Sequence, residues 1–491
     1  MVRESSIRFE RGLLHRQTDR QAPLLKSFLL MAGDDNSQIV ILEPTINPIS
    51  THSAIRIPDF DTLLEMVNGS YDSFSNCEAP LGEQLSDTIS RKMETELDIQ
   101  MIYEDIMSKG SDTIPTLNRN HHAAFCHGVI SGPIPGMFSK LDASKPWVSF
   151  WLMNAAVLLK TGLSSQEKSN ASSFLISILD KSFTDDNSYY GFGGGAYQLP
   201  HLAASYAAIL TLALTEDEQA WALIDVKKIK TWLLKMKQPN GSFIMHQGGE
   251  SDTRAVYCAL CIASLLNILD DELTEGTAEW LIRCQTYEGG FAGEPGDEAH
   301  GGYTYCGVAA LLILLSPDEL LKSGLDLDSL VKWTVDRQYS LEGGFSGRSN
   351  KLVDGCYSHW VGGTCALLEA IFNYQNNEDS SSFRSLIDRQ RLQNYVLCCC
   401  QDKMGLRDKP GCRADFYHTN YVLCGLSMCQ YYQVYDKEAV AKYGNAFFAE
   451  PVEIEDSNVV DIDNANKVAA LDAIFGLPYG YAMKMHDFFL V

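Results

Sequence analysis

Two short segments of the chain hold three side chains that suit one metal ion. Asp354 and Cys356 flank a glycine in the first segment, and His418 ends the later run Asp415–His418. Together they offer one oxygen, one sulfur and one nitrogen ligand. Three protein ligands leave a fourth position open, which is how catalytic zinc sites differ from closed structural ones. The pattern indicates a zinc ion that activates an incoming group, although an Asp-x-Cys pair taken alone usually has no such role.

The composition limits the class of protein. A hydrophobic content of 45% is ordinary for a globular chain of 491 residues. The net charge of −24 argues against nucleic acid or an anionic membrane as the partner. The longest apolar run, near Val308–Leu315, is far too short to span a membrane, and Leu24–Ala32 lacks the layout of a signal peptide. The cysteines are scattered, with three in a row at Cys398–Cys400, which is typical of reduced thiols in a cytoplasmic protein.

The chain divides into a front without repeats and a repetitive remainder. Residues 1–110 form an N-terminal extension of loops, such as Met31–Asp59, with helical spacing over Asp87–Gly110. We assign residues 111–449 to one repetitive domain and residues 450–491 to a C-terminal segment.

A glycine turn followed by a large apolar residue recurs in that domain at intervals of roughly fifty to sixty residues, a period typical of repeat architectures. The turns are Gly191-Phe192, Gly241-Ser242-Phe243, Gly289-Gly290-Phe291, Gly343-Gly344-Phe345 and Gly405-Leu406. A glutamine precedes four of them: Gln238, Gln285, Gln338 and Gln401. A strongly apolar run follows each turn: Tyr206–Leu214, Ala255–Leu269, Tyr305–Leu315, Gly362–Tyr374 and Tyr421–Tyr431. Glycine just past a helix end permits the left-handed conformation that turns the chain back.

Each repeat is therefore predicted to be a helical hairpin. One helix is apolar nearly all round and belongs inside, whereas the other is amphipathic and belongs outside. Stacked hairpins give an all-α domain, either an open solenoid or a closed ring of two concentric layers. The loops after the outer helices would gather at one end of the inner layer, and Asp354, Cys356 and His418 all lie in such loops or directly after them.

Three segments resemble the β subunit of protein farnesyltransferases: Gly344–Tyr357, Glu298–Gly307 and Asp415–Thr419. The similarity runs from about Leu141 to Tyr431. It implies an α/α barrel, or toroid, of about six helical hairpins that works as a heterodimer with a helical-repeat α subunit. It also implies transfer of farnesyl from farnesyl diphosphate to the cysteine thiol of C-terminal CaaX sequences, such as those of small GTPases.

The resemblance assigns chemical roles to individual residues. Asp354, Cys356 and His418 would bind one zinc ion, whose open position receives and deprotonates the substrate thiol. The diphosphate would be held by His300, Arg348, Lys351 and Tyr357, and Tyr357 is also counted as catalytic. The alternative for Arg348 and Lys351 is an ordinary ion pair with Asp354 or Glu342.

Further residues match the binding surfaces of the family. For the prenyl donor these are Trp147, Arg254, Tyr257, Gly301, Gly302, Tyr303, Cys306 and Trp360. A bulky residue at Trp147 limits chain length in the farnesyl branch, and Asp408 stands where farnesyltransferases carry an acid that helps to place magnesium on the diphosphate. His201 and Ala203 match the peptide side of the cleft.

Two stretches depart from the family pattern. His359 stands where an aromatic residue is usual, and Cys412 and Ala414 stand in a stretch that is usually more basic.

Three alternatives stay open at this point. A geranylgeranyltransferase type I β subunit shares the fold and the zinc site, but Trp147 and Asp408 speak against it. A terpene cyclase shares the barrel and its turns, but it needs no Cys/His metal site. A non-catalytic helical scaffold would leave the clustered Asp354, Cys356 and His418 as a coincidence.

Overall fold

The computed structural model describes residues 86–110, 114–131, 136–180, 190–376, 383, 385–457, 459–460 and 463–490. The chain forms two units, Met1–Ile57 and Pro58–Val491, and every described residue belongs to the second. The loops predicted before residue 86 lie outside the described residues, whereas the helical spacing after it is confirmed by α3 (Asp87–Ser108). None of the described helices is long and apolar enough to cross a membrane.

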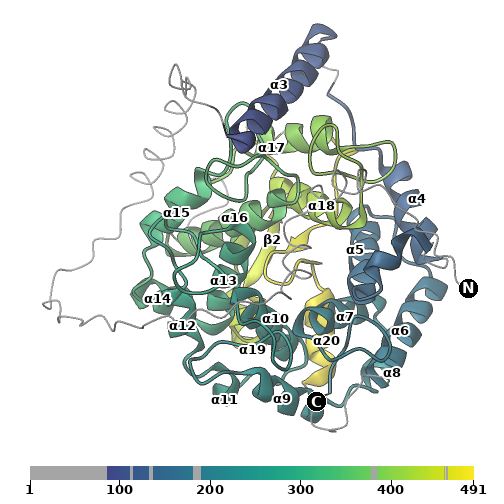
Figure 1. Ribbon diagram of the computed structural model, residues 1–491, viewed down its shortest axis with the longest axis vertical. Coiled ribbons are helices and arrows are strands. Elements are labelled where there is room, and N and C mark those ends of the chain that lie inside the picture. Colours follow the sequence, from purple (N-terminus) through teal and green to yellow (C-terminus); the bar gives the residue numbers. More distant parts are fainter. Residues whose placement is uncertain are drawn as a thin grey trace, which may run out of the picture. The chain divides into compact units, whose positions relative to one another are not determined.

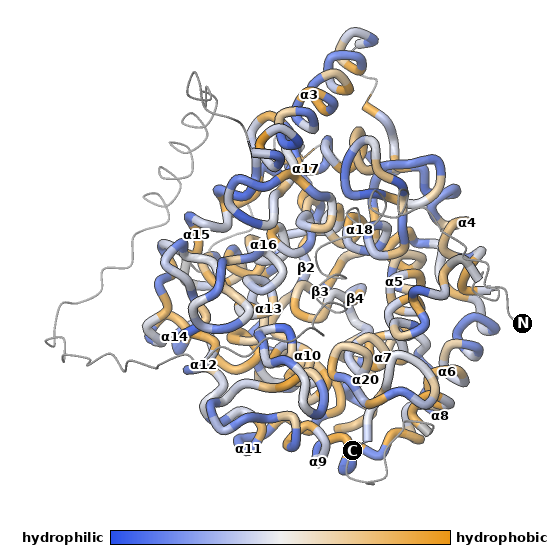
Figure 2. The backbone as a smooth tube through the Cα atoms, viewed as in Figure 1, coloured by the Kyte–Doolittle hydropathy of each residue, from blue (hydrophilic) through white to orange (hydrophobic). Residues whose placement is uncertain are grey.

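Six helices form a closed inner ring (Figure 1). They are α5 (Lys145–Leu158), α7 (Leu202–Thr215), α10 (Thr253–Leu265), α13 (Gly301–Leu314), α16 (Tyr357–Asn376) and α18 (Phe416–Gln430). Each contacts the next, and α18 returns to contact α5, so the predicted hairpins close into a toroid and not an open solenoid. Every residue of α7, α10 and α18 is buried, because these sequences are apolar nearly all round (Figure 2).

The outer layer consists of amphipathic helices, most of them shorter than the inner ones. They are α4 (Arg119–Ile130), α6 (Ser165–Asp180), α8 (Glu218–Trp221), α9 (Val226–Met236), α11 (Asp271–Thr274), α12 (Thr277–Arg283), α14 (Pro317–Lys322), α15 (Leu327–Val335) and α17 (Arg389–Tyr395). In α9, for example, Ile229, Trp232, Leu233 and Met236 are buried at helical spacing while its lysines face outward. Burial of such a stripe against the inner ring is what holds a short amphipathic helix in place.

Each glycine turn follows an outer helix and leads to the next inner helix. Phe291 and Phe345 form β-bridges with Gln285 and Gln338. At Gly289 φ is 105°, and a Cβ there would lie 2.0 Å from the Ser329 carbonyl oxygen, so no other residue fits.

The glutamine side chains clamp the start of the next outer helix. Gln338 Nε2 donates to the Gly343 and Asp388 carbonyls, and its Oε1 accepts from the Asp388 N–H, the N-cap of α17. Gln285 makes the same bonds with Gly289 and with Asp326, the N-cap of α15. Gln401 accepts from the N–H of Asn118, the N-cap of α4, which joins the last repeat to the first.

The inner helices all begin at the same end of the ring. A backbone N–H at or just before the start of an inner helix donates to a carbonyl in the loop that precedes the next one. These pairs are Lys145 to Gly194, Leu202 to Met245, Thr253 to Gly293, Gly301 to Gly347, and Gly355 to Asp408. The inner helices are therefore parallel, and the positive ends of their dipoles gather at this end, here called the N-terminal rim.

The part of the chain that follows α18 crosses the centre of the ring (Figure 1). It contains β1 (Tyr431–Tyr435), which pairs with β2 (Ala449–Glu453), and β3 (Leu471–Asp472), which pairs with β4 (Leu477–Pro478). The helices α19 (Lys437–Tyr443) and α20 (Tyr481–Phe489) and the short turn η5 (Asn445–Phe447) complete it. Three inner-helix hydroxyls donate to its backbone: Tyr206 to Phe475, Tyr257 to Ile474 and Tyr305 to Ala473, at 2.9, 2.6 and 2.7 Å.

Candidate metal centre

The predicted metal ligands meet at the N-terminal rim, between α16 and α18. Asp354 and Cys356 lie in the turn that leads into α16, and His418 lies in the first turn of α18. One ligand atom of each residue lies within 4.8 Å of the others, and all three residues are buried. An oxygen, a sulfur and a nitrogen in one buried group fit zinc, which accepts all three ligand types.

The electrostatics of the group suit a cation. Burial raises the pKa of Asp354, but His418, whose Nε2 lies 3.2 Å from Asp354 Oδ1, outweighs it and holds the pKa below its usual range. Burial alone would lower the pKa of His418. Asp415 and Asp354 outweigh burial and hold this pKa well above its usual value. Burial and then Asp354 raise the pKa of the Cys356 thiol. Metal binding would therefore displace protons from His418 and Cys356, as it does when ligands must be deprotonated.

Asp415 orients His418, a role that the sequence did not suggest. Its Oδ2 lies 2.7 Å from His418 Nδ1, and its Oδ1 accepts from the His418 backbone N–H as the N-cap of α18. The bond to Nδ1 leaves Nε2 directed at Asp354. A carboxylate behind a histidine ligand fixes the ring and raises its basicity. The signal available in the sequence was an acid three residues before a candidate histidine ligand.

A neutral histidine supports a tyrosine hydroxyl beside the metal group. His300 Nε2 lies 3.1 Å from the Tyr357 hydroxyl, and His300 Nδ1 accepts from the Gly302 N–H as the N-cap of α13. Burial, with Arg348 and Arg254 nearby, lowers the pKa of His300 to about 3. The neutral ring therefore carries its hydrogen on Nε2 and donates a hydrogen bond to the Tyr357 hydroxyl oxygen. The hydroxyl hydrogen of Tyr357 is then available to another acceptor.

Glycines permit the close approach of Tyr357. A Cβ on Gly301 would lie 2.7 Å from Val361 Cγ2, and one on Gly347 would lie 1.9 Å from Tyr357 Cζ. The predicted residues Gly301, His300 and Tyr357 are thus brought together by a packing requirement.

The predicted cations stand on the loop before α16. Arg348 pairs with Glu298 at 2.9 Å, not with Asp354 or Glu342, and the Lys351 carbonyl accepts from Tyr339. Arg254, on the first turn of α10, is buried and bound by both oxygens of Asp252, and it lies 5.3 Å from the centre of the Tyr303 ring.

Aromatic side chains from the inner helices form a continuous belt around the inside of the ring. We call these residues the aromatic belt: Trp147, Tyr206, Tyr257, Tyr305, Trp360, Tyr421, Tyr417 and Trp151. Successive rings lie 4.5 to 5.7 Å apart between centroids, and the last contacts the first. The predicted Trp147, Tyr257 and Trp360 belong to it, and Cys306 is buried on α13. The spacing of apolar residues alone could not show which aromatics face inward.

Asp408 lies next to the metal ligands. Its carbonyl accepts from the Gly355 N–H and from the Tyr395 hydroxyl, both at 2.7 Å. Its carboxylate is paired with Lys409 Nζ at 2.6 Å. A cation at this carboxylate would have to displace or join Lys409.

His201 and His359 are not part of the metal group. His201 is the N-cap of α7, accepts from Ala203 and lies 5.4 Å from the His246 ring. His359 is buried between Tyr305 and Tyr421, and burial lowers its pKa to about 3.

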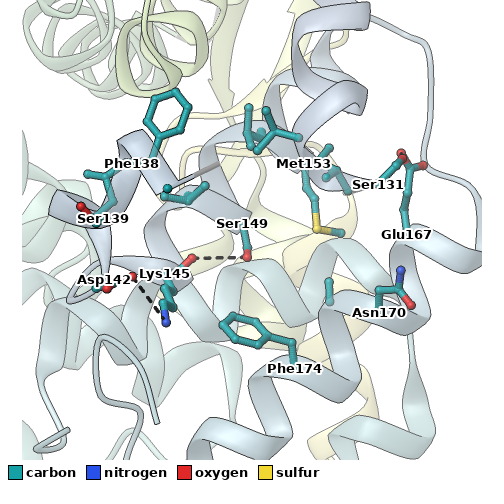
Figure 3. Close-up of a pocket in the computed structure, with 17 residues that line it drawn as sticks. Ser131, Phe138, Ser139, Asp142, Lys145, Ser149, Met153, Glu167, Asn170 and Phe174 are labelled. Atoms are coloured by element: carbon teal, nitrogen blue, oxygen red, sulfur yellow. Dashed lines mark hydrogen bonds and ion pairs between the residues drawn. The ribbon is translucent and has the colours of Figure 1, made fainter. Parts of the chain in front are cut away.

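A hollow of about 660 Å³ opens elsewhere, between α4, the turn η2 (Gly136–Leu141), α5 and α6 (Figure 3). Phe138, Met153 and Phe174 line it, and Lys145 pairs with Asp142 at its edge at 3.6 Å. None of the predicted site residues lines it.

Comparisons with known proteins place the chain. The family described as "Prenyltransferase alpha-alpha toroid domain" matches residues 117–477. The protein farnesyltransferase subunit beta of Pyricularia oryzae is 33% identical over 93% of this chain and 89% of its own length. The protein farnesyltransferase subunit beta of Saccharomyces cerevisiae is 43% identical over 72% of this chain and 77% of its own length. The chain belongs to the protein farnesyltransferase β-subunit family.

A geranylgeranyl transferase subunit is a more distant relative than these two. The geranylgeranyl transferase type-1 subunit beta of Arabidopsis thaliana is 31% identical over 50% of this chain and 66% of its own length. The solved structure of Candida albicans protein geranylgeranyltransferase-I complexed with GGPP is 21% identical and aligns with a TM-score of 0.57 over 76% of this chain and 99% of that chain. This structural match supports the toroid fold alone.

Proposed function

We propose that this chain is the catalytic β subunit of a protein farnesyltransferase, which transfers farnesyl from farnesyl diphosphate to the cysteine thiol of CaaX proteins. The observation that carries the proposal is the buried Asp354, Cys356 and His418 group, which stands at the N-terminal rim beside the aromatic belt. A terpene cyclase or a scaffold has no use for such a group.

Zinc bound by Asp354, Cys356 and His418 would supply an open position at which a substrate thiol becomes a thiolate. Asp415 holds the His418 ring in the orientation that directs Nε2 towards Asp354, where the two residues would share the metal ion. Burial excludes water, which keeps the electrostatic interactions of the site strong.

The diphosphate is proposed to lie over the starts of α13 and α16. The positive ends of these helices favour an anion. The Tyr357 hydroxyl oxygen accepts a hydrogen bond from neutral His300, and its own hydroxyl hydrogen is directed to a leaving oxygen. Arg348 and Lys351 supply charge from the loop above, with Arg348 exchanging Glu298 for phosphate.

The isoprenoid is proposed to lie against the aromatic belt, with Arg254, Tyr303 and Cys306 beside it. Trp147 narrows the belt and favours the fifteen-carbon donor. Asp408 is proposed to hold magnesium with the diphosphate oxygens once Lys409 yields.

The wider assembly follows from the same proposal. The chain pairs with a prenyltransferase α subunit, accepts CaaX proteins such as small GTPases and works in the cytoplasm, with His201 and Ala203 on the peptide side. We keep residues 1–110, 111–449 and 450–491 as the proposed division of the chain.

Donor competition tests the proposal. The heterodimer is given equal farnesyl and geranylgeranyl diphosphate with one CaaX peptide, and farnesyl is expected to dominate the product. Trp147→Ala should shift the product towards the twenty-carbon chain, whereas Trp147→Phe, which keeps most of the bulk, should not. A wild-type preference for geranylgeranyl would favour the type I enzyme, and no transfer of either would sink the proposal.

A further inference from the structure

Helix α3 carries apolar residues on two faces, and one face packs on the ring. Ile99 is fully buried, the Tyr103 hydroxyl donates to the Glu342 carbonyl at 2.8 Å, and Lys92 Nζ lies 4.6 Å from the centre of the Tyr339 ring. This face also contacts the π-helical turn η4 (Val396–Cys400). These contacts anchor the helix without any help from its second face.

The second face is an exposed row of large apolar side chains. Ile89, Met93, Leu97 and Met101 follow one another at intervals of four residues, and they are 42, 46, 59 and 67% exposed. We call them the apolar ridge. Side chains at this interval form the ridges that pack into the grooves of a neighbouring helix. Exposed apolar residues scattered singly are ordinary, whereas a contiguous row marks an interaction surface.

Charge distinguishes the kinds of partner that the ridge can accept. Glu94 and Asp98 share one exposed edge of α3 beside the ridge, and Asp105 on the same edge is paired with Lys109. A second copy of this chain, with its net charge of −24, would bring acidic edge against acidic edge. A helix whose apolar face is flanked by lysine or arginine would pack its apolar face on the ridge and place its positive charges beside the acidic edge. Two methionines in the ridge add side chains that adapt their shape to such a face.

We propose that the apolar ridge of α3 is a docking surface for a base-flanked, amphipathic helix of the α subunit. The inference rests on the heterodimer of the proposed function and adds the surface at which part of it forms. Because α3 precedes residues 117–477, this surface lies outside the part of the chain matched by the toroid family.

The test uses the full chain, with an α subunit of a farnesyltransferase from the same organism. The ridge variant is Leu97→Glu with Met101→Glu, and glutamate keeps the helix intact. The control is Arg91→Gln with Lys109→Gln, which changes the charge of the same helix by the same amount and leaves the ridge untouched. Three quantities are measured: the Kd of the heterodimer, the transfer rate at saturating α subunit and the Tm of the isolated chain.

The ridge variant is expected to bind about tenfold or more weakly, because large side chains at the centre of an interface dominate its affinity. The control should stay within about threefold, and the saturated transfer rate and the Tm should not change. Equal Kd values for the ridge variant and the control would overturn the inference. A lower Tm of the isolated ridge variant would assign the ridge to contacts within the chain, and wild-type self-association lost in that variant would assign it to a second copy. If the wild-type chain binds no α subunit at all, the proposed heterodimer fails first and this inference with it.

Discussion

At the scale of single residues, side-chain types were sufficient to predict the metal group, but Asp415, which orients one of its ligands, could be identified only from the structure. Asp354, Cys356 and His418 were identifiable as an oxygen, a sulfur and a nitrogen ligand, and the structure brings them together. Asp415 was not identifiable, because its role depends on the geometry of the first turn of α18. The neutral state of His300 likewise follows from burial and from Arg348, which no local pattern encodes.

Asp415→Asn should weaken zinc binding by about tenfold to a hundredfold, the usual cost of losing the carboxylate behind a histidine ligand. Asparagine still caps α18, so the fold is retained. Competition with a chelator measures the zinc affinity, and circular dichroism checks the helix. Unchanged affinity would contradict the role assigned to Asp415.

His359→Phe should stabilise the protein by about 1 kcal/mol at pH 7, because His359 Nδ1 is buried without a hydrogen-bond partner among the described residues. The pKa of His359 falls from 6.5 to about 3 on folding. Below pH 6.5 this histidine is therefore protonated in the unfolded chain but stays neutral in the folded chain. The free energy of unfolding of the wild type decreases as the pH falls. The variant's advantage should grow by about 1.4 kcal/mol per pH unit below 6.5. Urea unfolding at pH 7 and pH 5 measures it, with the exposed His121→Gln as control; an advantage that does not change with pH would refute this account of His359.

At the scale of elements, apolar runs predicted five of the inner helices. The runs from Tyr206, Ala255, Tyr305, Gly362 and Tyr421 correspond to α7, α10, α13, α16 and α18. The sixth, α5, lies before the first glycine turn at Gly191, so the repeat pattern did not predict it. The sequence showed that the glutamines recur before the glycine turns. It could not show their bonds to the next N-cap, because these bonds join residues about forty to fifty positions apart or more.

Gln338→Ala should lower the free energy of unfolding by about 2 to 4 kcal/mol, because it removes the bonds of this side chain to the N–H and carbonyl of Asp388 and to the Gly343 carbonyl. Gln166→Ala, an exposed helical position bonded only to Asn170 one turn away, should change it by less than about 0.5 kcal/mol. Denaturant unfolding compares the two. Similar effects of both substitutions would mean that the clamp contributes little.

At the scale of the whole molecule, the repeat pattern alone allowed a solenoid or a ring, because similar repeats build either, whereas the family resemblance implied the toroid that the structure confirms. Closure comes from contacts between the two ends of the array, α18 with α5 and Gln401 with Asn118. The predicted C-terminal segment, residues 450–491, supplies the backbone that accepts from Tyr206, Tyr257 and Tyr305. The resemblance stated from the sequence ended at about Tyr431, so it did not predict that role, whereas the family match extends into the segment as far as residue 477.

The buried Asp472 gives this central segment a pH dependence. Burial raises its pKa from 3.8 to about 7, although the Ile474 and Phe475 N–H groups bond to it. The folded chain therefore holds a proton that the unfolded chain loses above pH 4, and this group lowers stability by about 1.4 kcal/mol per unit as pH rises to 7. Asp472→Asn should remove that slope, which thermal unfolding at pH 5 and pH 7.5 measures. An unchanged slope would show that Asp472 ionises freely in the folded state.

The central claim is that the Asp354, Cys356 and His418 group holds one zinc ion on which transfer depends. The direct measurement is the zinc content and CaaX transfer rate of the purified heterodimer, compared for wild type, Cys356→Ala and the control Cys412→Ala. We predict one zinc per β subunit in wild type and control, and loss of both zinc and transfer in Cys356→Ala. Full transfer by Cys356→Ala, or by a zinc-free wild-type heterodimer, would contradict the account.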